Sequence, residues 1–82
     1  MKICIDERTY EGNATEIMEQ LRQQTFDPTE YPDTESYIYQ LRSNFIRATD
    51  LDCPLPESGV ERQARTMFTH LAKAGALTIL EE

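Results

Sequence analysis

The stretch from Ser58 to Leu80 constrains the fold of this chain more than any other part of its sequence. Its apolar residues recur every three or four positions, which is the spacing of one buried helix face. Gly75 follows at the position of a left-handed helix cap, and residues 76–80 then have strand composition. The apolar face consists of Val60, Ala64, Met67, Phe68, Leu71 and Ala74. The pattern predicts a helix over 58–74, with Ser58 and Glu61 as a capping pair, and a short strand after it.

The first eleven residues predict a β-hairpin. Residues 2–6 alternate between apolar and polar side chains, and residues 9–11 form a second β-prone segment before a glycine. With Glu7 and Arg8 at the tip, Ile5 is expected to lie opposite Tyr10 on one face of the hairpin.

Two further helices are expected between the hairpin and residue 58. Asn13 and Glu16 have capping-box spacing and predict a helix over 14–24. Prolines break the segment 25–32, whose Phe26 and Tyr31 are expected to pack on the core. A second helix then begins after Asp33 or Thr34. Its expected inner face consists of Tyr37, Ile38, Leu41, Phe45 and Ala48, and a second strip beside it consists of Tyr39, Arg42 and Ile46.

These elements predict a single domain over residues 1–82 with an α+β fold. Its three-helix layer packs on a small antiparallel sheet, in the order ββαααβ. The final strand is expected to run antiparallel to the first, which places Leu77 and Ile79 beside Ile3 and Ile5. The three helices are expected to alternate in direction along the chain.

The charge of the chain limits its partners. Its net charge is −7, and residues 1–57 hold twelve of the fifteen acids but only five of the eight bases. Such a field repels phosphate, so binding to nucleic acid or to an anionic membrane is not expected. No apolar run approaches the roughly 18 residues that cross a bilayer, and the first residues do not resemble a signal peptide. The sequence therefore predicts a cytoplasmic protein whose two cysteines, Cys4 and Cys53, are reduced thiols.

No group of residues has the spacing of a catalytic, cofactor or metal site. The acid pairs Asp6-Glu7 and Asp50-Leu51-Asp52 lack the pattern of a calcium loop, and they are expected to be solvated. His70 is the single histidine and has no nearby nucleophile in the sequence. We therefore expect no enzymatic activity, no cofactor and no metal.

The sequence favours a protein-interaction module that binds another protein or a second copy of itself. Side chains two positions apart on a helix diverge, so Tyr37 and Tyr39 cannot both face the core. Tyr39, Arg42 and Ile46 are the predicted contact residues, since tyrosine and arginine are enriched in interfaces. In size and style the chain is typical of a bacterial or phage accessory protein.

The alternative is a winged-helix-like DNA-binding domain that reads DNA through helix 58–74. The polar face of this helix carries bases and hydroxyls that are able to reach phosphates or base edges. Its residues are Arg62, Arg65, Thr66, Thr69 and Lys73. The acids at 81–82 and the long connection before the helix oppose this alternative.

Overall fold

The computed structural model describes residues 1–25 and 32–82, and its elements follow the predicted order ββαααβ. The expected packing of Phe26 and Tyr31 lies outside the described residues. The elements are β1 (Lys2–Ile5), β2 (Arg8–Glu11), α1 (Ala14–Gln23), α2 (Thr34–Thr49), α3 (Val60–Lys73) and β3 (Thr78–Glu81). The capping box of Asn13 and Glu16 forms at α1, and Asp33 caps α2.

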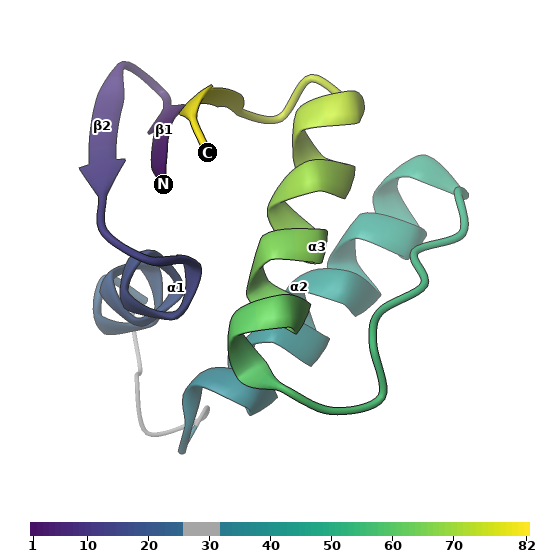
Figure 1. Ribbon diagram of the computed structural model, residues 1–82. Helices are drawn as coiled ribbons and strands as arrows, with labels where there is room; N and C mark the ends of the chain where they lie inside the picture. The colour runs from purple at the N-terminus through teal and green to yellow at the C-terminus, as the bar shows by residue number, and fades with distance from the viewer. Residues whose placement is uncertain (26–31) are drawn as a thin grey trace.

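The three strands form one antiparallel sheet in the order β2-β1-β3, and the helices lie on one side of it (Figure 1). Ile3 in the central strand pairs with Tyr10 in β2 and with Ile79 in β3. Ile3 and Tyr10 are buried against the helices, and Phe68 of α3 is the largest of the fully buried side chains. The predicted α+β class and the antiparallel final strand are therefore confirmed.

The two-residue turn of the hairpin lies one residue earlier in the chain than predicted. The tip is Asp6-Glu7, so Tyr10 faces Ile3 and Ile5 faces Arg8. Asp6 and Glu7 have φ values of 50° and 70°. A two-residue hairpin turn with positive φ at both positions has a backbone twist that matches the right-handed twist of the two strands. The observed register pairs the fully buried Ile3 with Tyr10. In the predicted register Tyr10 would pair with Ile5 instead.

Glu7→Gly is expected to stabilise the protein by about 0.5–1 kcal/mol, because glycine relieves the left-handed strain of a residue with a Cβ. Glu11→Gly is the matched control, since Glu11 lies within β2 and glycine there is expected to destabilise by about the same amount. Urea denaturation of both variants measures the difference. A lower stability for Glu7→Gly than for the wild type contradicts the turn geometry.

The end of α3 follows the prediction at Gly75. Its φ is 82°, and the Ala76 and Gly75 amides donate to the carbonyls of Leu71 and Ala72 at 2.9 and 3.1 Å. This is the Schellman pattern. The strand begins two residues later than predicted. In its ladder Lys2 pairs with Glu81 and Ile3 with Ile79, so Leu80 is an extra residue at a bulge, where it is exposed.

The helices do not alternate in direction, because α2 and α3 run side by side in the same direction (Figure 1). Tyr39 contacts Gln63 near the start of both helices, and Phe45 lies beside His70 further along both. Residues 50–59 run back from the end of α2 to the start of α3 (Figure 1). Two prolines keep that segment out of a helix, and in extended form it spans more than the ~24 Å length of α2. The predicted alternation of helix directions is wrong because this connection is long enough to reach the end of the molecule where α2 begins.

We call residues 50–59 the strap. Three side chains from the two parallel helices hold carbonyl groups of the strap, and each of these helix residues is at least partly buried. Arg42 Nε donates to the Cys53 carbonyl at 2.7 Å, Gln63 Nε2 donates to Pro56 at 3.0 Å, and His70 Nε2 lies 3.0 Å from the Pro54 carbonyl. The fully buried Cys53 then packs on Met67.

The buried faces of the helices contain fewer residues in the structure than predicted. Ala48 and Ala74 are exposed instead of buried, because Ala48 lies in the last turn of α2 and Ala74 is the C-cap of α3. Val60 and Leu71 are only half-buried at the margins of the core.

Candidate functional site

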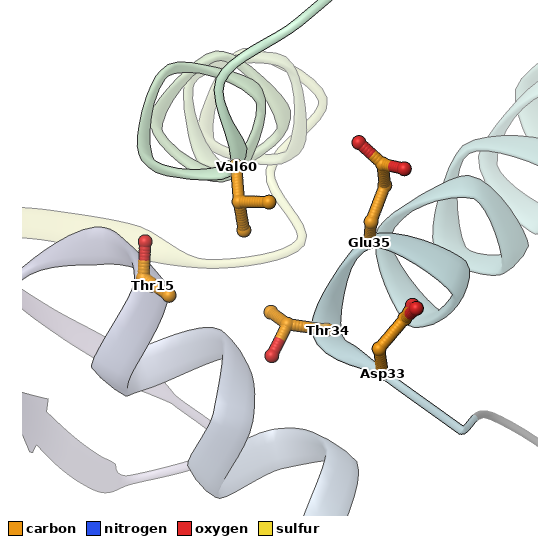
Figure 2. Close-up of a pocket in the computed structure, with 5 residues that line it drawn as sticks. All are labelled: Thr15, Asp33, Thr34, Glu35 and Val60. Carbon is orange, nitrogen blue, oxygen red and sulfur yellow. The ribbon is translucent and has the colours of Figure 1, made fainter.

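The starts of all three helices surround a cavity of about 340 Å³ (Figure 2). Thr15 from α1, Asp33, Thr34 and Glu35 from the start of α2, and Val60 from α3 line it. The parallel course of α2 and α3 brings their first turns to the same end of the molecule. None of these five residues was predicted as a site residue, since only the packing of the helices places them together.

The first turn of α1 is held against α3 by Glu61. Its carboxylate accepts hydrogen bonds from the amides of Ala14 and Thr15 at 3.0 and 2.8 Å, and from the Thr15 hydroxyl at 2.8 Å. Burial opposes the charge of Glu61, but these bonds and one from Arg65 outweigh it, so the pKa of Glu61 is lowered.

The predicted capping pair of Ser58 and Glu61 is therefore wrong. Gly59 is the N-cap of α3 and makes no side-chain capping bond. Glu61 satisfies the start of a neighbouring helix instead, where two amide groups otherwise have no intrahelical partner.

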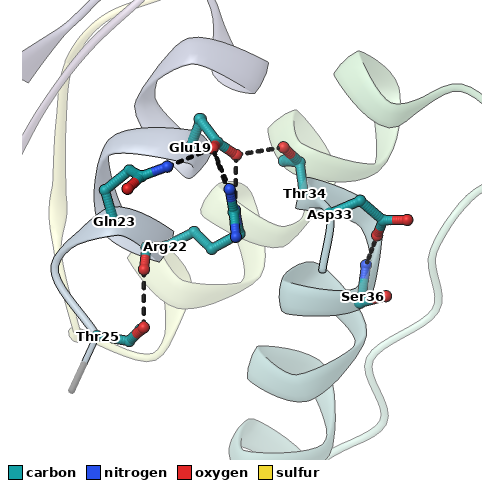
Figure 3. Close-up of polar contacts among 7 residues, drawn as sticks. All are labelled: Glu19, Arg22, Gln23, Thr25, Asp33, Thr34 and Ser36. Carbon is teal, nitrogen blue, oxygen red and sulfur yellow. Dashed lines mark hydrogen bonds and ion pairs between the residues drawn. The ribbon is translucent and has the colours of Figure 1, made fainter. Parts of the chain in front are cut away.

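A second polar network fixes Thr34 on the other side of the cavity (Figure 3). The Thr34 hydroxyl donates to Glu19 at 2.6 Å, and Arg22 donates to the same carboxylate at 2.6 and 2.9 Å. Hydrogen bonds from Arg22, Thr34 and Gln23 lower the pKa of Glu19 to about 2. This network joins α1 to the first turn of α2.

Asp33 and Glu35 supply the acidic part of the cavity. The Asp33 side chain accepts from the Ser36 amide at 2.8 Å, which lowers the pKa of Asp33 and keeps it ionised. Glu35 is exposed, and within the described residues its carboxylate has no hydrogen bond or ion pair. Glu35 is therefore an available anionic group at the cavity.

The floor of the cavity is apolar. Both threonine hydroxyls donate to carboxylates outside it, as the distances above show, so the Thr15 and Thr34 methyl groups point toward the cavity, together with the side chain of Val60 (Figure 2). The cavity thus combines a floor of methyl groups with a free carboxylate beside it.

The predicted contact strip on α2 is only partly exposed. Tyr39 is 42% exposed, and its hydroxyl accepts from Gln63 Nε2 at 3.4 Å. Arg42 is half-buried and bonded to the strap, and Ile46 is half-buried against the core. Tyr39 lies one helical turn after Glu35, and residues four apart share a helix face, so Tyr39 shares a face of α2 with the cavity residue Glu35.

Gln63 was missed by the sequence analysis, although it positions Tyr39. Its side chain is fully buried, and it bonds to both Tyr39 and Pro56. Within the described residues Gln63 Oε1 has no hydrogen-bond partner. The available signal was its position: Gln63 stands four residues before Met67, at the margin of the apolar face.

The basic face of α3 is less available than its sequence suggests. Arg62, Arg65 and Lys73 are exposed, but Arg65 pairs with Glu61 at 3.2 Å. Thr66 and Thr69 are half-buried, and the Thr69 hydroxyl donates to the Arg65 carbonyl at 3.0 Å. The parallel course of α2 and α3 also differs from the roughly perpendicular helices of a helix-turn-helix.

The remaining polar groups are distributed without forming a further site. Cys4 is half-buried and Cys53 buried, both are free thiols, and burial raises the pKa of Cys53. In residues 1–25 and 32–82, no three His, Cys, Asp or Glu side chains are grouped so that they could hold a metal ion. Over the same residues no helix has the length and apolar character needed to cross a membrane.

Comparison with known proteins gives no relative. No family model, no curated protein and no solved structure matches the chain. Any functional inference therefore depends on the geometry of the chain itself.

Proposed function

We propose that this chain is an acidic protein-interaction module of the cytoplasm, which binds another protein or a second copy of itself and catalyses no reaction. The observation that carries the proposal is Tyr39, an exposed aromatic side chain on the same face of α2 as the cavity residue Glu35. The two free thiols agree with a reducing compartment.

Tyr39 has the properties of an interface anchor. Tyrosine is enriched among the residues that dominate binding energies, and its ring offers a large contact area with few rotatable bonds. A contact from the buried Gln63 amide, long for a hydrogen bond at 3.4 Å, favours this orientation of the ring before any partner arrives. A restrained side chain loses less conformational entropy on binding, so more of its contact energy contributes to affinity.

Arg42 and Ile46 have a smaller part in this proposal than the sequence pattern predicts. Arg42 supports the strap, and Ile46 supports the core. We therefore place the contact on Tyr39 and the adjoining cavity, with Arg42 and Ile46 behind it. The DNA-binding alternative gains no specific observation, because Arg65 is paired with Glu61 and the hydroxyls of α3 are half-buried.

Tyr39→Ala is expected to abolish partner capture and self-association while it leaves the melting temperature within about 3 °C, as for a change at an exposed site. Tagged protein serves as bait in extracts of its native host, and sedimentation velocity measures self-association. Leu51→Ala is the matched control, since Leu51 is 55% exposed but lies beyond the far end of α2. Capture that is unchanged in Tyr39→Ala, or lost equally in Leu51→Ala, contradicts the proposal.

A further inference from the structure

We propose that the cavity between the three helix starts receives the aliphatic, cationic side chain of a lysine from a basic segment of the partner protein. This inference rests on the proposed function and specifies the chemistry of the partner. It is carried by the pairing of an apolar floor with an unpaired carboxylate, and by the charge of the surrounding protein.

The floor of the cavity fits the stem of such a side chain. Thr15, Thr34 and Val60 present methyl groups, because both threonine hydroxyls are bonded elsewhere. A lysine stem consists of four methylene groups and is regularly buried along apolar surface while its charged end stays in water. A volume of about 340 Å³ has room for one such side chain.

The rim fits the ammonium group. The carboxylate of Glu35 has no hydrogen bond or ion pair within the described residues, and Asp33 is ionised and accepts from Ser36. Arg65 is paired with Glu61, and Arg22 is paired with Glu19 and also attracts Asp33. The carboxylate of Glu35 therefore remains to receive an incoming positive charge, with the negative charge of Asp33 beside it.

Acceptor side chains cap two of the three helix starts at the cavity, α1 and α2, whereas the start of α3 has no side-chain cap. A helix N-terminus carries a partial positive charge on its unsatisfied amide groups. At α1 the Asn13 and Glu61 side chains accept from the first amides, and at α2 Asp33 does so. The net charge of −7 adds a long-range attraction for a basic partner.

Two peptides of equal charge separate insertion into the cavity from attraction at a distance. The first is a blocked hexapeptide of alternating glycine and lysine, and the second replaces each lysine by 2,4-diaminobutyrate, whose stem is two methylenes shorter. Each is titrated at pH 6 into the ¹⁵N-labelled full chain. We expect the lysine peptide to bind about fivefold to tenfold more tightly, because its longer stem buries more apolar surface. The amide signals of Thr15, Glu35 and Val60 should shift most.

Charge-matched variants test the role of Glu35. Glu35→Gln is expected to weaken binding of the lysine peptide about fivefold or more, as for the loss of a charge-assisted contact. Asp50→Asn removes one carboxylate at the other end of α2 and keeps a residue type that tolerates the left-handed φ of 57°. This control is expected to change the affinity less than about twofold.

Three results overturn the inference: equal affinity for the two peptides, equal loss in the two variants, or no shift at these amides with millimolar peptide. They are distinguishable from failure of the proposed function. If Tyr39→Ala abolishes capture but the peptides do not enter the cavity, the partner uses the Tyr39 surface alone. If the lysine peptide binds as expected but Tyr39→Ala keeps its partners, the cavity is a cation site and the proposed contact surface is wrong.

Discussion

Phe68→Ala is expected to lower the free energy of unfolding by about 3–5 kcal/mol, the largest effect of any substitution considered for this chain. Phe68 is a fully buried member of the core cluster, so truncation loses its burial energy and leaves a cavity. A domain of 82 residues has a total stability of only about 4–12 kcal/mol. Circular dichroism at 37 °C should therefore show a large unfolded fraction, and urea denaturation should measure the loss.

Leu71→Ala gives the matched comparison within the same helix. Leu71 is half-buried, so its truncation removes less buried surface and opens a space that solvent is able to fill. We expect a cost of about 1–2 kcal/mol, smaller than for a fully buried leucine. Equal losses for the two variants contradict the burial pattern of α3 and place the core on a different face of this helix.

Local chemistry predicted most of the secondary structure. The capping box at Asn13, the acidic cap at Asp33 and the glycine at 75 all occur where the sequence placed them, because each involves residues within a few positions of each other. The element order and the antiparallel pairing of β1 with β3 were predicted as well. Strand pairing followed from the need to cover the apolar faces of very short strands.

Arrangements that depend on contacts distant in sequence were predicted less well. The hairpin tip shifted because Glu7 adopts a left-handed conformation that its residue type does not signal, although Asp6 beside it is a residue type that tolerates one. The helix directions differed because nothing local shows that a ten-residue strap will cross back and be held by Arg42 and His70. Both errors arise where burial elsewhere outweighs a local preference.

The cavity was beyond prediction for the same reason. Thr15, Thr34 and Val60 come from three different helices, and a threonine in a helix start is ordinarily read as a cap. Here the threonine hydroxyls serve carboxylates on other helices, which leaves their methyl groups for the cavity. Tyr39, in contrast, was predicted to be exposed, because its divergence from Tyr37 follows from helix geometry alone.

Glu61→Ala is expected to destabilise the protein by about 2 kcal/mol, since it removes hydrogen bonds to two amides and one hydroxyl at the start of α1. Glu61→Gln keeps one acceptor oxygen and should lose about half as much. Glu57→Ala is the control, because Glu57 is exposed and its loss should change stability by less than about 0.5 kcal/mol. Amide exchange should also quicken at Ala14 and Thr15. If Glu61→Ala is as stable as Glu57→Ala, Glu61 does not cap α1.

The pH dependence of this loss gives an independent test of the same contact. The pKa of Glu61 is lowered in the folded protein by its hydrogen bonds, despite the opposing effect of burial. A carboxylate of this kind stabilises the fold above its unfolded pKa of about 4.3, and the contribution is lost as the pH falls through the folded value. The difference in stability between wild type and Glu61→Ala should therefore be constant from pH 7 to pH 5 and shrink below about pH 4. Glu19, whose pKa is also lowered, is present in both proteins, so its titration cancels in this difference. A difference that does not change down to pH 3 means that Glu61 acts through packing and not through its charge.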